Sequence, residues 1–487
     1  MEFEIIIGFE VHAELKTSTK LFCDCKVTYG APQNTHICPL CTGQPGALPV
    51  LNKKAVEYCL RAGLAMNCSI NNDSLFARKN YFYPDLSKGY QISQYERPLC
   101  ENGYITILGD DEEAYSVGIK RIHLEEDAGK LVHSSESISS SEYSLIDYNR
   151  SGIPLLEIVS DHTINPLRSV KEARSYLEQI RQILRYTEVS DCIIEKGQFR
   201  CDVNISLRKR GSTAFGNRSE IKNMTSFRFI SEALDFEIKR QSKLLQEGKK
   251  IEQETRLYNE ERKITLPMRS KEDAPDYRYF PDPDLIELEL EQDFIDKISK
   301  GNRVLPDELL KLIVEKYNVS KKDANLLTRN KSVAKFFTEC ATYTTNYKKL
   351  AKWIINNLLL LLKNNSLSIE SAKIKPKDFA SLVNMIVKSD ITDRIGKTLL
   401  TEMIISGKSP EIIIEEKGIV TVEDEKQLNK FVDNAFISHP NIIEQLRAGE
   451  TKAINVLIGD VMLASKGNAD AKRLKKIISQ RVKNPDK

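Results

Sequence analysis

Segments in which apolar and polar residues alternate recur up to about residue 290 of this 487-residue chain, and they constrain its fold more than any other feature. Alternation with a period of two is typical of β-strands that bury one face. The clearest segments lie at 7–12, 120–127, 200–207 and 219–223. Two longer segments, 169–186 and 226–248, have helical spacing instead. Because strands and helices do not alternate regularly, the pattern favours an α+β fold over a doubly wound parallel sheet.

The pattern changes near residue 290, where the strand signals fade and Leu, Ile, Lys and Asn take up helical spacing. Residues 350–362 are the most apolar part of this region, and we expect them to form a buried helix of a bundle. The sequence therefore predicts three parts, with bounds at 1–292, 293–406 and 407–487. The first is the α+β part, and the other two are all-helical.

Composition excludes several classes of protein. Hydrophobic residues make up 41% and charged residues 29%, and the net charge is only +3, so we expect neither a disordered chain nor a polybasic nucleic-acid binder. No apolar run approaches eighteen residues, and the N-terminus lacks a basic segment, so we expect neither a membrane span nor a signal peptide.

Four of the ten cysteines form two close pairs, Cys23 with Cys25 and Cys38 with Cys41. Two pairs at this spacing match a tetrahedral Zn²⁺ site in which all four ligands are thiolates. Such a site leaves no position open for a substrate, so we expect the zinc to be structural. The other cysteines show no pairing, and core packing is expected for them.

Acidic residues share the polar faces of several expected strands. Alternation puts Glu10 and His12 on one face, and Glu157 stands alone in an apolar run. A buried carboxylate is costly unless it is paired or binds a cation. The alternative is a solvated strand face, which is common in antiparallel sheets. The pattern indicates a metal-dependent site on a sheet, with phosphate chemistry as one use of it. No Walker A loop, dinucleotide-binding motif, nucleophile elbow or H-E-x-x-H motif is present.

Several longer strings carry a family resemblance. They are IGFEVHAELKT, RKNYFYPDLSKGYQISQY, HLEEDAGKLVH, IDYNRSGIPLLEIVS, RCDVNISLR, EIKNMTSF and DYRYFPDPDL, with GKSPEIIIEEKG and NVLIGDVMLASKGNAD nearer the C-terminus. Together they resemble the B subunits of the tRNA-dependent amidotransferases, the GatB family. The likeness covers the first 285 residues closely and the C-terminal region more loosely.

The resemblance implies a fold and an activity. The fold is a curved antiparallel sheet similar to glutamine synthetase and the guanidino kinases, followed by helical domains with a YqeY-like tail that contacts tRNA. The activity is ATP-dependent phosphorylation of the side-chain carboxylate of mischarged Glu-tRNA(Gln) or Asp-tRNA(Asn), followed by amidation. Ammonia would come from a separate amidase (glutaminase) subunit, and a small third subunit would complete the heterotrimer. A cytoplasmic location is expected, with an organelle as the alternative.

The resemblance also implies roles for individual residues. Mg²⁺ ligands and catalytic residues would be Glu10, His12, Glu157 and one or both of Glu125 and Glu126, of which strand alternation favours Glu125. Contacts to ATP or substrate would come from Lys79, Arg150, Asp202, Asn204, Glu220 and Lys222. The cysteine quartet would be the family's zinc knuckle. A non-catalytic tRNA-binding scaffold and a free-standing carboxylate–amine ligase are the alternatives.

Overall fold

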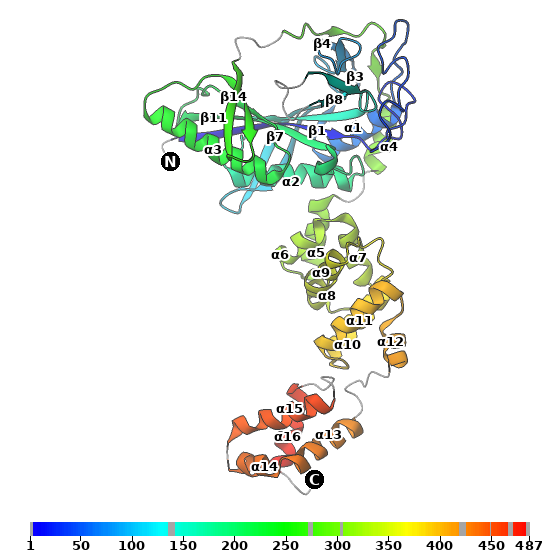
Figure 1. The fold of residues 1–487 in the computed structure, drawn as a ribbon, viewed down its shortest axis with the longest axis vertical. Coiled ribbons are helices and arrows are strands. Elements are labelled where there is room, and N and C mark those ends of the chain that lie inside the picture. Colours follow the sequence, from blue (N-terminus) through cyan, green and yellow to red (C-terminus); the bar gives the residue numbers. More distant parts are fainter. Residues whose placement is uncertain are drawn as a thin grey trace. The chain divides into compact units, whose positions relative to one another are not determined.

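The computed structural model describes residues 3–134, 142–270, 276–301, 305–417, 425–448, 450–465 and 471–483. The chain forms two compact units, Met1–Leu305 and Pro306–Lys487 (Figure 1). The C-terminal end of the sequence is rich in Lys and Arg, and its residues 466–470 and 484–487 lie outside the described ones.

A nine-stranded sheet forms the centre of the first unit. Its order is β14-β13-β12-β11-β1-β10-β7-β6-β2. The strands are β1 (Phe3–Glu14), β2 (Ser69–Ile70), β6 (Cys100–Leu108), β7 (Ala114–Glu126), β10 (Pro154–Asp161), β11 (Phe199–Lys209), β12 (Ser219–Lys222), β13 (Glu254–Asn259) and β14 (Ile264–Ser270). The α+β prediction is confirmed. The predicted antiparallel sheet is confirmed only in part, because β12 and β13 pair in parallel. Helix α3 (Phe227–Gln246) connects these two strands, and such a crossover brings the second strand back in the same direction.

Three helices cover one face of the sheet, as Figure 1 shows for α2 and α3. They are α1 (Lys53–Ala65), α2 (Val170–Tyr186) and α3. The last two confirm the helices predicted at 169–186 and 226–248, and each begins with a serine whose side chain accepts a backbone hydrogen bond from the first turn. Phe9 of β1 stacks on Tyr176 of α2 with ring centroids 5.9 Å apart, so the apolar side of each alternating strand faces these helices.

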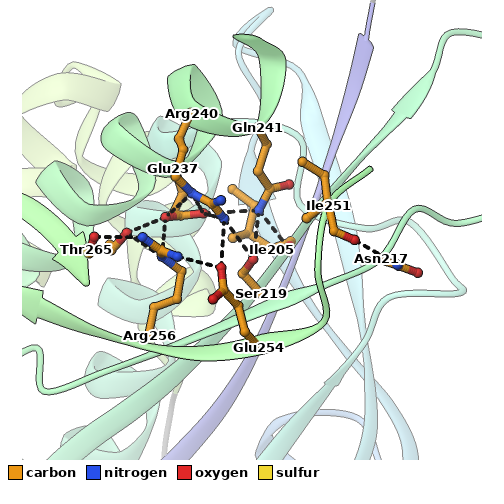
Figure 2. A network of polar contacts seen from close by, with 10 residues as sticks. All are labelled: Ile205, Asn217, Ser219, Glu237, Arg240, Gln241, Ile251, Glu254, Arg256 and Thr265. Carbon is orange, nitrogen blue, oxygen red and sulfur yellow. Dashed lines mark hydrogen bonds and ion pairs between the residues drawn. The ribbon is translucent and has the colours of Figure 1, made fainter. Parts of the chain in front are cut away.

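A buried polar network fixes α3 to the sheet (Figure 2). The Glu237 carboxylate is fully buried and accepts a 2.9 Å hydrogen bond from Arg240 Nε. It also lies 3.0 Å from Arg256 Nε of β13. Arg256 Nη2 donates to the Thr265 carbonyl oxygen at 2.8 Å. Burial raises the pKa of Glu237, but the hydrogen bonds of Arg240 and Thr265 and the two positive charges outweigh it and leave the pKa below its ordinary value.

Three smaller sheets accompany the large one among the described residues, and one of them reaches the open face. In that sheet, β4 (Ala77–Asn80) lies between β5 (Tyr90–Ser93) and β15 (Phe280–Pro281). The Asn80 N–H donates to the Tyr277 carbonyl oxygen at 2.9 Å, which holds residues 277–279 beside β4. The others are β3 (Asp73–Ser74) with β16 (Leu288–Glu289), and β8 (Lys130–His133) with β9 (Ser144–Asp147).

The described residues of the second unit form helices around two cores. One core spans Ile313 to Ile413 and the other Leu428 to Val482. The helices are α5 (Pro306–Tyr317), α6 (Lys321–Thr328), α7 (Lys331–Cys340), α8 (Tyr347–Trp353), α9 (Leu359–Asn364), α10 (Pro376–Lys388), α11 (Asp393–Ser406), α12 (Pro410–Lys417), α13 (Glu425–Ser438), α14 (Pro440–Arg447), α15 (Ile454–Ala464) and α16 (Ala471–Lys483). The predicted bundle helix at 350–362 is confirmed: α8 and α9 flank a π-helical turn, Ile354–Leu358, and bury Leu350, Ile354, Leu358 and Leu362.

The three-part division of the chain stays a prediction. Helix α4 (Gln292–Gly301) packs Ile295 and Ile298 into the core of the first unit. Helix α12 packs Ile413 with the helices that precede it. Among the described residues, no helix is both long and apolar enough to cross a membrane.

Candidate functional site

A cavity of about 610 Å³ opens on the sheet face that the helices leave uncovered. Its floor is formed by the polar sides of β1, β7, β10, β11 and β12, and its wall by β4 and residues 277–279. Most of the candidates predicted from the sequence line it: Glu10, His12, Lys79, Glu125, Arg150, Glu157, Asp202, Glu220 and Lys222. The fold therefore brings these residues into one cavity, although they are far apart along the chain.

His12, Glu125 and Glu157 form the centre of the cavity. His12 Nε2 lies 3.2 Å from Glu125 Oε1 and 3.6 Å from Glu157 Oε2. Strand register explains the arrangement, because His12 of β1 is directly opposite Glu157 of β10. Glu157 is in turn opposite His123 of β7, whose Nε2 lies 3.3 Å from Glu157 Oε2. One donor atom from each of His12, Glu125 and Glu157 can lie within 4.8 Å of the others, a spacing that suits one metal ion.

Charged groups in this cluster are buried, and a buried charge is costly unless it is paired. Glu125 is 3% exposed, and among the described residues its Oε2 has no hydrogen-bond partner. Burial lowers the pKa of His12, but hydrogen bonds and charge from Glu125 and Glu157 outweigh it and raise the pKa to about 10. Burial also raises the pKa of Glu157, which His123 and His12 together bring well below its ordinary value. A buried carboxylate oxygen without a partner is a position where a cation fits.

A second set of acidic residues, Glu10, Asp202 and Glu220, lies in the same cavity as the cluster of His12, Glu125 and Glu157. Glu10 of β1 is opposite Asp202 of β11, and Asn204 of β11 is opposite Glu220 of β12. Burial raises the pKa of Glu10, and the charges of Glu157, Asp202 and Glu220 add to the effect. Lys222 Nζ lies 2.6 Å from Asp202 Oδ2 and 3.3 Å from Glu220 Oε1, so one ammonium group partly compensates these carboxylates.

Cationic side chains form the rest of the wall. Burial lowers the pKa of Lys79, but the nearby carboxylates, Glu125 first, raise it above its ordinary value, so its ammonium group stays charged. The Arg150 guanidinium binds Asp127 through two hydrogen bonds of 2.6 and 2.8 Å. Arg200 Nη2 donates to the same carboxylate at 3.1 Å. The cavity therefore combines buried carboxylates with fixed positive charges.

Two sequence candidates lie outside this cavity. Glu126 points to the opposite side of β7, where its Oε1 lies 2.5 Å from Lys88 Nζ and accepts a hydrogen bond from the Ile92 N–H. This placement favours Glu125 as the ligand. Asn204 lines a neighbouring cavity of about 360 Å³, and its Nδ2 donates to Glu10 Oε1 at 3.3 Å.

Several residues of the main cavity were not among the predicted site residues. They include His123, Asp127, Arg200, Gln91 and Gln94. The alternation over residues 120–127 contained the signal for His123 and Asp127, because each lies two positions from Glu125 and so on the same side. Nothing in the sequence pattern indicated that β5 would reach the site.

The four predicted cysteines come together in the loop that follows β1. Cys23 Sγ and Cys38 Sγ each lie 3.7 Å from Cys41 Sγ, and one sulfur from each of the four lies within 4.8 Å of the others. Tetrahedral Zn²⁺ with bonds of about 2.3 Å places its sulfur ligands roughly 3.8 Å apart, so the residues fit zinc. A hydrogen bond from Cys23 and the nearby Lys20 lower the pKa of Cys41 to about 4, which favours the thiolate that a metal requires.

Two family models match the sequence. A model described as the GatB/GatE catalytic domain matches residues 5–296, and one described as the GatB domain matches residues 335–482.

Full-length relatives match as well. The B subunit of an aspartyl/glutamyl-tRNA(Asn/Gln) amidotransferase from Persephonella marina is 47% identical over 484 residues, which cover 99% of this chain and 100% of that protein. Proteins of the same name from Carboxydothermus hydrogenoformans and Thermodesulfovibrio yellowstonii are 45% and 46% identical. Each of these alignments covers 99% of this chain, and 99% and 100% of the respective relatives.

Proposed function

This chain belongs to the GatB family, the B subunits of aspartyl/glutamyl-tRNA(Asn/Gln) amidotransferases, and from that membership we propose what its cavity does. The chain is part of a glutamine-dependent amidotransferase that acts in translation. Its cavity activates the side-chain carboxylate of Glu-tRNA(Gln) or Asp-tRNA(Asn) with ATP and then amidates it. The observation that carries this proposal is the convergence of His12, Glu125 and Glu157 beneath the cationic wall.

The proposed reaction has two steps. An oxygen of the substrate carboxylate attacks the γ-phosphorus of ATP, the bond to the β-phosphate oxygen breaks, and ADP leaves. Ammonia then attacks the acyl carbon, the bond to the phosphoryl oxygen breaks, and inorganic phosphate leaves while the nitrogen loses a proton. The first step is needed because a carboxylate oxygen is a poor leaving group. Phosphoryl transfer depends mainly on positioning and charge neutralisation, which a fixed polar cavity supplies.

The residues divide this work by position. Glu125, Glu157 and His12 would hold a divalent cation, with Glu10 beside them; Mg²⁺, when bound, shields the charge of the phosphate oxygens. Lys79, Lys222 and Arg150 present fixed positive charge to phosphate or substrate oxygens. Asp202 and Glu220 orient Lys222, and Asp127 orients Arg150. Lys222 and Arg150 therefore approach the substrate with their directions already set.

The neighbouring cavity is suited to the rest of the nucleotide. It shares Glu10 with the main cavity and offers the Asn204 amide, the Ser206 hydroxyl and the exposed Phe215 ring. An aromatic face beside amide and hydroxyl groups suits a purine and its ribose. We place the base of ATP there, with the phosphates directed toward Glu10.

Further features follow from the family. We propose that the catalytic unit has the glutamine synthetase and guanidino kinase type of fold, that Zn²⁺ occupies the cysteine cluster, and that the partners are an amidase (glutaminase) subunit of the same complex together with its small third subunit. We assign tRNA contact to the helical tail, predicted at 407–487. Support for these statements comes from the predominantly antiparallel sheet, the geometry of the four sulfurs and the name of the relatives.

The test is glutamine- and ATP-dependent amidation of each mischarged tRNA by the chain purified with its partner proteins. Glu157→Ala and Glu10→Ala should abolish ATP hydrolysis that depends on mischarged tRNA, while tRNA binding persists. Wild-type turnover in both variants would instead favour a non-catalytic tRNA-binding scaffold.

A further inference from the structure

The cysteine loop and the cationic wall of the cavity share one short segment, residues 146–152. This segment comprises the last two residues of β9 and most of the turn that leads to β10, and it carries Arg150. Arg150 lines the cavity, and its guanidinium binds Asp127 there. The residues just before Arg150 contact the loop that holds Cys23 to Cys41.

Asn34, which lies between the two cysteine pairs, makes most of these contacts. Its Nδ2 donates to the Ile146 carbonyl oxygen at 2.9 Å, and its Oδ1 accepts from the Tyr148 N–H at 2.7 Å. Its own N–H donates to Asp147 Oδ1 at 3.1 Å. Asn34 therefore binds one backbone edge of the segment, on either side of Asp147, as a neighbouring strand would.

Asn149 makes two hydrogen bonds to the cysteine loop. Its Oδ1 accepts from the His36 N–H at 2.8 Å, and its Nδ2 donates to the Pro32 carbonyl oxygen at 2.7 Å. The two asparagines thus bind each other's backbone segments reciprocally, directly before Arg150.

Lys20 connects the segment to the sulfur cluster itself. Its side chain is fully buried, and its Nζ lies 3.2 Å from Cys41 Sγ and donates to the Tyr148 carbonyl oxygen at 3.0 Å. A buried ammonium group is costly without an anionic partner, and a cluster of thiolates supplies one. Beyond Arg150, the Leu21 N–H donates to the Gly152 carbonyl oxygen and the Gly152 N–H to the Asp127 carbonyl oxygen. The segment is therefore held on both sides of Arg150.

We propose that the cysteine cluster positions Arg150 for the reaction through Lys20, Asn34 and Asn149. In this view the metal-bound loop is part of the cavity's support, and Lys20, Asn34 and Asn149 are positioning residues. The proposal rests on the proposed function for its effect on catalysis. The structural coupling itself does not depend on that function.

Hydrogen exchange measures the coupling without any assay of activity. In the wild-type complex we compare residues 146–152 with the control peptide 199–209, which covers central strand β11. Cys38→Ser, with its zinc loss confirmed by elemental analysis, should speed exchange in 146–152 by about tenfold and leave 199–209 unchanged. Equal exchange in 146–152 with and without zinc would overturn the proposal. Equal acceleration in both peptides would also overturn it, because that result indicates general destabilisation.

Asn34→Ala separates the coupling from metal binding, since Asn34 contributes no sulfur ligand. We expect one zinc per chain to remain, exchange in 146–152 to speed up, and KM for ATP to rise about three- to tenfold with kcat less affected. Thr42→Val is the matched control, because the hydrogen bonds that Thr42 Oγ1 donates to the Cys38 and Pro39 carbonyl oxygens stay within the cysteine loop. Its KM should stay at the wild-type value.

A double-mutant cycle shows whether the effect passes through Arg150. In an Arg150→Ala background, Asn34→Ala should raise KM no further. A full additional rise would mean that Asn34 acts by another route and would overturn the proposal. If the wild-type complex hydrolysed no ATP, the proposed function would fail, while the exchange experiment would still decide the coupling.

Discussion

His12 Nε2 lies 3.2 Å from Glu125 Oε1 although β1 and β7, the strands that carry them, are not neighbours. Strand β10 lies between them and contributes Glu157 to the same cluster. Three adjacent strands therefore each supply one donor group, and the sheet's hydrogen bonds fix the spacing. This arrangement makes the contribution of each residue separately testable.

Glu125→Gln and Glu126→Gln test which of two adjacent glutamates binds the cation. Glu125→Gln should weaken Mg²⁺ or Mn²⁺ binding and lower tRNA-dependent ATP hydrolysis by at least about a hundredfold, because it removes a buried ligand charge. Glu126→Gln should lower the melting temperature through loss of the Lys88 ion pair, with metal affinity unchanged. Metal titration and thermal unfolding of both variants are the measurements. The reverse pattern would assign the ligand to Glu126.

Replacing Cys38 and Cys41 by serine should release one zinc per chain and lower the melting temperature of the first unit. The reason is that metal binding to a loop with few apolar contacts contributes directly to its folding. Cys68→Ala provides the comparison, because Cys68 is buried in the core and lies outside the cysteine cluster. It should cost stability without changing the zinc content, which elemental analysis measures. Retention of zinc by the double-serine variant would refute the four-sulfur site.

Stability toward acid should depend on Glu237. Its pKa is lowered in the folded chain, so its contribution to stability is complete above its unfolded pKa of about 4.5 and is lost as pH falls through the folded pKa. Glu237→Gln should lower the free energy of unfolding by about 3 kcal/mol at pH 7, since Arg240 and Arg256 lose their buried partner. The difference from wild type should shrink as the pH approaches 3. Urea unfolding over this pH range measures it, with exposed Glu247→Gln as the variant expected to change little.

The nucleotide placement predicts an effect of Phe215→Ala. Loss of the ring face should raise KM for ATP about fivefold with little change in kcat, because a stacking contact contributes about 1 kcal/mol. KM for the mischarged tRNA should stay the same. A change confined to tRNA would mean that this cavity receives the aminoacyl end instead.

Removing the chain after Lys417 tests the tail. The core from Leu428 to Val482 is separate from the one that contains Ile413, so truncation at this point leaves the earlier core complete. We expect KM for tRNA to rise several-fold while the glutaminase activity of the complex without tRNA is retained. Steady-state kinetics with each substrate gives the answer. An unchanged KM for tRNA would remove the assignment of the tail.

Short-range patterns predicted the local structure well. Alternation correctly placed Glu10 and His12 on the polar side of β1, and helical spacing located α2 and α3 to within a residue or two. The same alternation distinguished Glu125 from Glu126, and the structure places only Glu125 in the cavity. These features depend on contacts within one element, which sequence periodicity reports directly.

Long-range pairing could not be predicted in the same way. The placement of β10 between β1 and β7 brings Glu157 to His12, and nothing local to either strand encodes that choice of neighbour. The parallel pair of β12 and β13 depends on the path of the intervening helix. Lys79 enters the cavity from a separate small sheet. The contacts of Asn34 and Asn149 join residues more than a hundred positions apart, so they carry no sequence signature.

The strands that hold His12, Glu157 and Glu125 occupy interior positions of the nine-stranded sheet, with paired strands on both sides. Interior strands open only when much of the sheet opens, whereas edges fray at little cost. We therefore expect the cluster to melt together with its unit, so that heating destroys activity and tertiary structure at the same temperature. Evolution of new specificity in such a protein would then have to occur in the surrounding loops, which can change without loss of the cluster.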